Sequence, residues 1–212
     1  MKTRDQYSLW RLPRSGSTML LRSLRVLVDI DNQGHSFFTP HAPLIVTVRN
    51  PRDVLMSHWR IFYNHESETP EMSQLEDAKR SVWHRYDTLF KMEKAFDVFS
   101  IWQYELHRHH MIEWLEYALD IEITEAQAIE IDAICDPKAA KAIADGVEVV
   151  AGGKPFNSFD METGIHREHI GALLGEPGGW RDVLPEEYRP WMDKAAGWIE
   201  NKLAETGLAD YK

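Results

Sequence analysis

Hydrophobic and polar residues alternate in blocks near the start of the chain. Residues 7–12 have the apolar character of a short strand, and residues 13–18 form a polar stretch that contains Gly16. From 19 to 28, leucines and valines recur at the spacing of one helix face. This pattern predicts a strand, a tight loop and a helix in that order.

A second unit of the same kind follows. Residues 44–48 form an almost continuous β-branched run, which is typical of a strand buried on both faces. Asn50 can cap a helix and Pro51 suits its first turn, so we expect a helix from there towards Tyr63.

The rest of the chain is mainly helical in pattern. Residues 64–72 are acidic and polar, so we expect a surface loop there, whereas residues 146–179 show little periodicity. Strands that alternate with helices predict an α/β fold with a mainly parallel sheet, in a single domain over residues 1–212. A strand is predicted over 98–102, and helices over 73–94, 107–119, 124–133, 139–144 and 190–205.

The net charge of the chain limits the classes of partner that it is expected to bind. The net charge is −10, which disfavours nucleic acid as a main partner because such binding normally needs a basic face. The charge is uneven, since residues 1–60 hold nine Lys/Arg against four Asp/Glu and residues 61–212 hold fifteen against thirty. A basic N-terminal third suits a local anion site, although chance unevenness over a short window is the alternative.

The compartment is predicted from two simple features. Cys135 is the only cysteine of the sequence, which excludes an internal disulfide framework and fits a reducing compartment. No stretch approaches the roughly 20 apolar residues of a membrane span, and the N-terminal residues do not resemble a signal peptide. We therefore expect a cytoplasmic protein with no membrane span.

The polar loop at 13–18 has the composition of an anion site. A glycine-containing turn before a helix presents clustered backbone N–H groups, which bind phosphate or sulfate oxygens with help from the helix dipole. Ser17 and Thr18 add hydroxyl donors and Arg14 adds a cation. An ordinary strand–turn–helix corner would have the same outline. The loop lacks the lysine and the first glycine of a Walker A motif, so a nucleoside triphosphate with Mg²⁺ is not indicated.

Residues 13–18 resemble the donor loop of the PAPS-dependent sulfotransferase family, which uses 3′-phosphoadenosine-5′-phosphosulfate (PAPS). That loop binds the 5′-phosphosulfate, and residues 48–57 are similar to the family's segment for the 3′-phosphate. An arginine at the end of a buried strand, here Arg49, presents a bidentate fork to phosphate. The resemblance implies a P-loop-like three-layer α/β/α fold. The donor-binding residues that it implies in these two segments are Arg14, Ser15, Gly16, Ser17, Thr18, Arg49 and Ser57.

Two weaker matches follow in the family's order. Residues 102–106 resemble the stretch whose tyrosine lies beside the adenine, which implies that role for Tyr104, although Leu106 stands where the family has Asp. A buried structural tyrosine is the alternative. Residues 175–181 resemble the segment that closes over the donor, which adds Gly175 to the binding residues.

The resemblance fails just before Gly175. The family has an Arg-Lys pair there, but this chain has Leu173 and Leu174. Arg167 and His169 are the candidates to replace the missing cations.

Sulfuryl transfer depends mainly on positioning and on charge stabilisation, so the resemblance implies a cation at the leaving oxygen and a base for the acceptor. Arg14 is the predicted cation. The family's base is a histidine ahead of the Arg49 strand, and we prefer His35, which would begin a short strand ending near the loop. His41, beside two prolines, is the alternative, and either histidine could instead be a surface or hydrogen-bonded residue.

A metal site is not predicted. The spacing of His107, His109 and His110 does not place three ligands on one helix face, and no cysteine joins them.

The acceptor stays open. The interval from the first loop to Arg49 is shorter than in the larger cytosolic sulfotransferases, and residues 37–38 and 59–63 are aromatic candidates to line a reduced acceptor site. The sequence suits a small-molecule or carbohydrate acceptor and a monomer or homodimer. A P-loop kinase and a non-catalytic nucleotide-binding protein of the same fold are the alternative functions.

Overall fold

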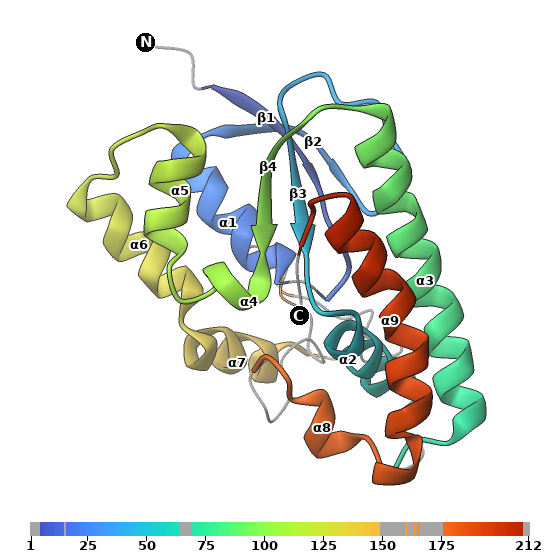
Figure 1. Cartoon of the computed structure of the whole chain (residues 1–212). Coiled ribbons are helices and arrows are strands. Elements are labelled where there is room, and N and C mark those ends of the chain that lie inside the picture. Colours follow the sequence, from blue (N-terminus) through green and yellow to red (C-terminus); the bar gives the residue numbers. More distant parts are fainter. Residues whose placement is uncertain are drawn as a thin grey trace.

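The computed structural model describes residues 5–14, 16–63, 69–148 and 176–209, together with three single positions between 160 and 165 (Figure 1). Four strands of these residues form one sheet in the order β2-β1-β3-β4, and every neighbouring pair is parallel. This confirms the predicted α/β fold with a parallel sheet. The strands are β1 (Gln6–Trp10), β2 (Asp29–Gly34), β3 (Leu44–Val48) and β4 (Val98–Gln103).

The centre of the sheet is buried on both faces, as the β-branched run predicts. All five residues of β3 are buried. Ile45 points into one hydrophobic core and Val46 into another, because successive side chains of a strand alternate between faces.

Helices cover both faces of the sheet and give the three layers (Figure 1). One core joins the sheet to α1 (Ser17–Leu27), α5 (Met111–Leu119) and α6 (Glu125–Cys135). The other joins it to α3 (Met72–Ala95) and α9 (Arg189–Glu205).

A third apolar cluster lies beyond the sheet. It joins α2 (Pro51–Tyr63) to α8 (Trp180–Val183) and to parts of α3 and α9. The remaining described elements are α4 (Tyr104–His107), α7 (Pro137–Gly146) and the 3₁₀ turn η2 (Glu186–Tyr188).

Two sequence predictions are wrong in detail. No strand begins at His35, because β2 occupies residues 29–34 and ends just before that residue. β2 is an edge strand with mostly polar side chains, so backbone pairing with β1 forms it without a hydrophobic alternation. The helix predicted over 107–119 is broken at 108–110 into α4 and α5.

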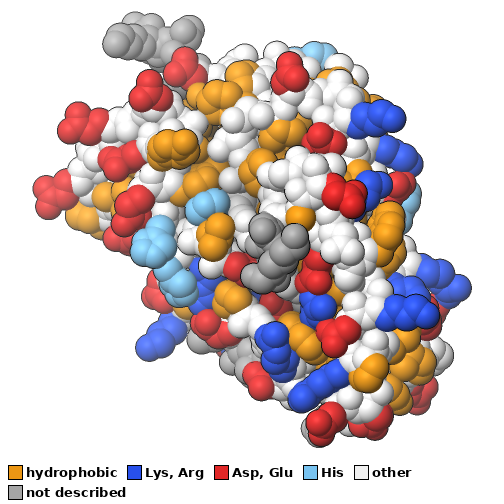
Figure 2. Space-filling model, viewed as in Figure 1, with side chains coloured by type: hydrophobic (Ala, Val, Ile, Leu, Met, Phe, Trp, Pro, Cys, Tyr) orange, Lys and Arg blue, Asp and Glu red, His pale blue; other side chains and the backbone are white. Residues whose placement is uncertain are grey.

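The surface reflects the acidic C-terminal part of the sequence. Figure 2 shows acidic side chains gathered over α5 and α6 on the face that it presents. Within the described part of the chain, no helix is long and apolar enough to cross a membrane.

Candidate active site

The sheet topology itself indicates where a ligand binds. After β1 the chain moves outward to β2 and then returns to β3 on the other side of β1. In open parallel sheets, ligands bind at the carboxyl ends of the strands at such a reversal. The two predicted donor segments begin where β1 and β3 end, so both lie at this edge.

The first loop has an unusual backbone at Arg14 and Gly16. Their φ angles are 67° and 71°, both in the left-handed region. A Cβ added at Gly16 would lie 2.5 Å from Cε2 of Tyr104, so only glycine allows this approach. Ser17 is buried and Thr18 is partly buried in the first turn of α1, while Ser15 lies outside the described residues.

The N-terminus of α1 is suited to an anion. It has no hydrogen-bonded side-chain cap from any described residue, and its first turn contains no acidic residue. Backbone N–H groups and the positive end of the helix dipole therefore face the loop.

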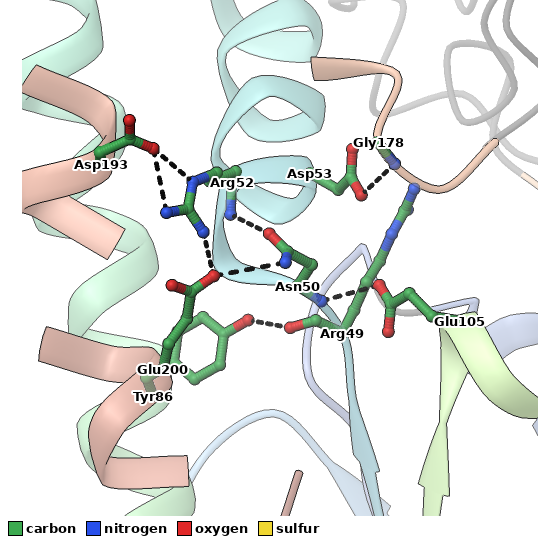
Figure 3. A network of polar contacts seen from close by, with 9 residues as sticks. All are labelled: Arg49, Asn50, Arg52, Asp53, Tyr86, Glu105, Gly178, Asp193 and Glu200. Atoms are coloured by element: carbon green, nitrogen blue, oxygen red, sulfur yellow. Dashed lines mark hydrogen bonds and ion pairs between the residues drawn. The ribbon is translucent and has the colours of Figure 1, made fainter. Parts of the chain in front are cut away.

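Arg49 joins the two donor segments. Its side chain is buried, and its Nη1 donates a hydrogen bond to the carbonyl oxygen of Arg14 over 2.8 Å. The guanidinium carbon also lies 4.4 Å from the centre of the Tyr104 ring. The backbone of Arg49 is held from the opposite side, where the Tyr86 hydroxyl donates to its carbonyl oxygen over 2.5 Å (Figure 3). Arg49 therefore fixes the loop as well as offering a cation.

The start of α2 is held by long-range polar contacts (Figure 3). Asn50 caps the helix, since its Oδ1 accepts the Arg52 N–H over 3.0 Å, as predicted. The Asn50 N–H in turn donates to Oε1 of Glu105 over 2.8 Å. The Asp53 carboxylate accepts the N–H groups of Gly178 and Trp180, at 2.8 and 3.2 Å. The segment before α8 is thus anchored beside the donor segments.

Arg52 adds a second anchor for α2. Its guanidinium forms ion pairs with Asp193, at 3.0 Å, and with Glu200, both on α9. These contacts attach the C-terminal helix to the 3′-phosphate segment. Ser57, the other predicted residue of that segment, is partly buried on α2.

Arg108 is a buried arginine that the sequence analysis missed. It is 8% exposed, and its guanidinium carbon lies 5.5 Å from the centre of the Tyr104 ring. Its Nη2 forms an ion pair of 2.5 Å with Glu176. The only available signal was a basic residue within the histidine-rich run after Tyr104.

His35 lies at the first loop, whereas His41 does not share its contacts. The Nδ1 atom of His35 is 2.5 Å from the carbonyl oxygen of Arg11. A carbonyl oxygen only accepts, so Nδ1 carries the proton and Nε2 is left as a proton acceptor. His41 is exposed on a bend.

His58 is a second histidine of this region that the sequence analysis did not select. Burial lowers the pKa of both His35 and His58 to about 4, and the charges of Arg14 and Arg85 lower it further. The hydrogen bond to Arg11 opposes this effect at His35. Both rings therefore lie in the field of the first loop and are neutral at pH 7.

Arg14 keeps its charge in this environment. Burial lowers its pKa to about 9, and the neighbouring charges of Arg60 and Arg49 contribute. The guanidinium is still protonated at neutral pH and can stabilise negative charge.

The histidine pKa values predict a pH dependence of stability. Because the folded pKa of His35 and His58 is about 4, against 6.5 for an unperturbed histidine, the unfolded state binds more protons between these values. The free energy of unfolding should therefore fall as the pH drops from 6.5 towards 4, by up to about 3 kcal/mol per histidine. Urea unfolding at pH 7, 6 and 5 measures this loss. His35→Asn should lose less unfolding free energy than the parent protein over this pH range. An equal dependence of unfolding free energy on pH in the two proteins would contradict the lowered pKa of His35.

Several other predicted features have outcomes in the structure. Trp59 is fully buried and donates to Gln74, so it cannot line an acceptor site. Phe37 lies against Phe96, which precedes β4. This contact is therefore at the amino ends of the strands, away from the donor segments at their carboxyl ends. Phe62 is exposed and its ring centre lies 4.4 Å from that of His58, so it remains a candidate to line the acceptor site.

The predictions for the segment before α8 fall outside the described residues. They concern Gly175 and the two candidates to replace the family's Arg-Lys pair, Arg167 and His169. Leu173 and Leu174, which stand in place of that pair, also lie outside the described residues.

The histidine run after Tyr104 makes ordinary hydrogen bonds. His107 accepts the Gln103 N–H over 3.0 Å, and His109 accepts from Nε of Arg108 over 2.8 Å. Across the described residues, no group of three or more His, Cys, Asp or Glu is arranged to hold a metal ion.

Comparison with known proteins supports a family assignment. Residues 22–125 match the family model of the sulfotransferase domain. The match supports placing the chain with the PAPS-dependent sulfotransferases. The matched residues include Arg49, Ser57 and Tyr104 and begin just after the first loop. The match favours a PAPS-dependent sulfotransferase over a P-loop kinase.

The fold agrees with this assignment. The crystal structure of mouse sulfotransferase SULT7A1 complexed with PAP (3′-phosphoadenosine-5′-phosphate) superimposes with a TM-score of 0.59. The two chains are 13% identical, and the match covers 96% of this chain and 87% of that one. A search of curated protein sequences found no match.

Proposed function

We propose that this sulfotransferase moves the sulfuryl group of PAPS to a hydroxyl or amine of a small-molecule or carbohydrate acceptor by in-line displacement. The observation that carries the proposal is the hydrogen bond between His35 Nδ1 and the Arg11 carbonyl. It leaves a proton-accepting nitrogen beside the loop that carries Arg14. A base and a cation at one anion-binding loop are what this reaction requires.

The residues at the sheet edge fit a doubly anionic nucleotide. Gly16 gives the loop its left-handed turn at the N-terminus of α1, where backbone N–H groups suit the 5′-phosphosulfate. Arg49, one strand further along, suits the 3′-phosphate, and Ser57 on α2 is assigned to the same group. Tyr104 lies against both segments and is assigned to the adenine side of the site.

Arg14 and His35 divide the chemistry. Arg14 stabilises the charge that develops on the phosphate oxygen as the sulfuryl group leaves, and PAPS departs as PAP. His35 accepts the proton of the acceptor at Nε2. Its low pKa keeps the ring neutral in the free protein, and the negative charge of the bound donor offsets the field of the neighbouring arginines, which raises its basicity.

The acceptor side is assigned to the region of His58 and Phe62. The Phe62 side chain is 42% exposed and its ring packs against the His58 ring at a tilt, so it offers an apolar surface beside the loop. Such a surface suits a phenol, or a sugar ring that stacks on an aromatic side chain.

The test is transfer of radiolabelled sulfuryl from PAPS to a panel of phenols, alcohols, amines and sugars. We expect labelled product and an equal amount of PAP with at least one acceptor class. Binding of PAP without transfer to any acceptor would contradict the enzymatic proposal and favour a non-catalytic nucleotide-binding protein.

A further inference from the structure

We propose that Arg108 is a further ligand for the donor's 3′-phosphate, and that Glu176 occupies its guanidinium until the donor binds. The proposal rests on the function proposed above. Arg108 would supply a cation that this chain otherwise lacks, because Leu173 and Leu174 stand where the family has an Arg-Lys pair before its closing segment.

Arg108 lies one aromatic ring away from the donor segments. The Tyr104 ring approaches Gly16 so closely that a Cβ there would overlap it, and the Arg49 guanidinium lies 4.4 Å from the ring centre. Arg108 lies 5.5 Å from the same ring centre. Two arginines from different elements, the end of β3 and the end of α4, therefore meet at one tyrosine beside the first loop.

The guanidinium of Arg108 is positioned in advance. Its Nε donates to Nε2 of His109 over 2.8 Å, and its Nη1 donates to the Tyr104 hydroxyl over 3.3 Å. These contacts fix the plane of the fork, and the side chain is 6% exposed. A buried cation that is oriented by neutral groups is suited to bind a dianion.

Glu176 supplies a carboxylate where a phosphate oxygen would fit. It pairs with Nη2 of Arg108 over 2.5 Å, but its own side chain is 58% exposed. The exposed glutamate can return to water at little cost, whereas the buried arginine needs an anionic partner. Glu176 also lies just before Gly178, whose N–H is bonded to Asp53 on α2. Release of Glu176 by the donor would therefore act on the segment anchored beside the 3′-phosphate site.

The test compares PAP with adenosine 5′-phosphate, which lacks the 3′-phosphate, by calorimetric titration. Arg108→Ala should weaken PAP binding about 30-fold or more and leave adenosine 5′-phosphate nearly unchanged. Arg108→Lys should retain part of the affinity, because it keeps the charge and loses the fork. Glu176→Gln should tighten PAP binding several-fold, and should have no such effect in the Arg108→Ala background.

Controls separate this proposal from the donor site itself. Arg80→Ala, at an exposed arginine on α3, should change neither nucleotide's affinity, and thermal melts of each variant check the fold. If Arg49→Ala weakens PAP binding while a folded Arg108→Ala or Arg108→Lys variant binds PAP like the parent, the role of Arg108 is overturned and the donor site stands. If the parent protein does not bind PAP, the proposed function fails together with this inference.

Discussion

Gly16→Ala should impair stability and turnover more than the same change at any other glycine that the structure describes. The new Cβ would lie 2.5 Å from the Tyr104 ring and 3.0 Å from the Trp102 ring, at a φ of 71° that side chains rarely adopt. We expect the free energy of unfolding to fall by about 2–4 kcal/mol, from backbone strain and overpacking together. Turnover should fall by about 100-fold or more, since the loop moves relative to Arg49. Thermal melts and the PAPS transfer assay measure the two effects.

Gly197→Ala is the matched control. Gly197 lies within α9, and a Cβ built there meets no atom within 4 Å. Alanine is the better helix former by about 1 kcal/mol, so this variant should be slightly more stable and fully active. Equal behaviour of the two alanine variants would contradict the close approach of Tyr104 to the loop.

His35→Asn should lower the turnover number by about 10² to 10⁴-fold and leave PAP binding intact. The asparagine amide can still donate to the Arg11 carbonyl, in place of Nδ1, while the proton-accepting Nε2 is lost. The variant therefore separates the base from the structural role of the side chain. Transfer to the best acceptor of the panel gives the turnover number, and titration with PAP gives the affinity.

His41→Ala should match the parent protein in both measurements, because His41 is exposed and away from the Arg11 contact. Parent-like turnover of His35→Asn would exclude His35 as the base. If His35→Asn lost PAP affinity by the same factor as turnover, the His35 side chain would support the donor site and not act as the base.

The sequence predicted those parts of the candidate site that depend on residues close together in the chain. The polar loop after β1 and the Arg49 segment after β3 are short stretches whose geometry follows from a strand end and a helix start. Asn50 capped α2 as expected, since a cap depends on residues two positions apart. The parallel sheet then brought the two segments together, because both follow carboxyl ends of adjacent strands.

Contacts between residues far apart in the chain could not be predicted from the sequence pattern. The approach of Tyr104 to Gly16 depends on how β4 packs beside β3, and Asp53 finds its partners at Gly178 and Trp180, more than a hundred residues away. β2 escaped prediction because its polar edge residues carry no hydrophobic period. Arg108 escaped because its burial exists only in the folded chain.

The most direct test of the donor site is calorimetric titration with PAP and, separately, with ATP and Mg²⁺. We expect PAP to bind the parent protein more tightly than ATP. Arg49→Ala should lose roughly 2–5 kcal/mol of PAP binding free energy, with its thermal stability followed in parallel because Arg49 also holds the first loop. Binding of ATP with Mg²⁺ and no detectable binding of PAP would contradict the account and favour a P-loop kinase.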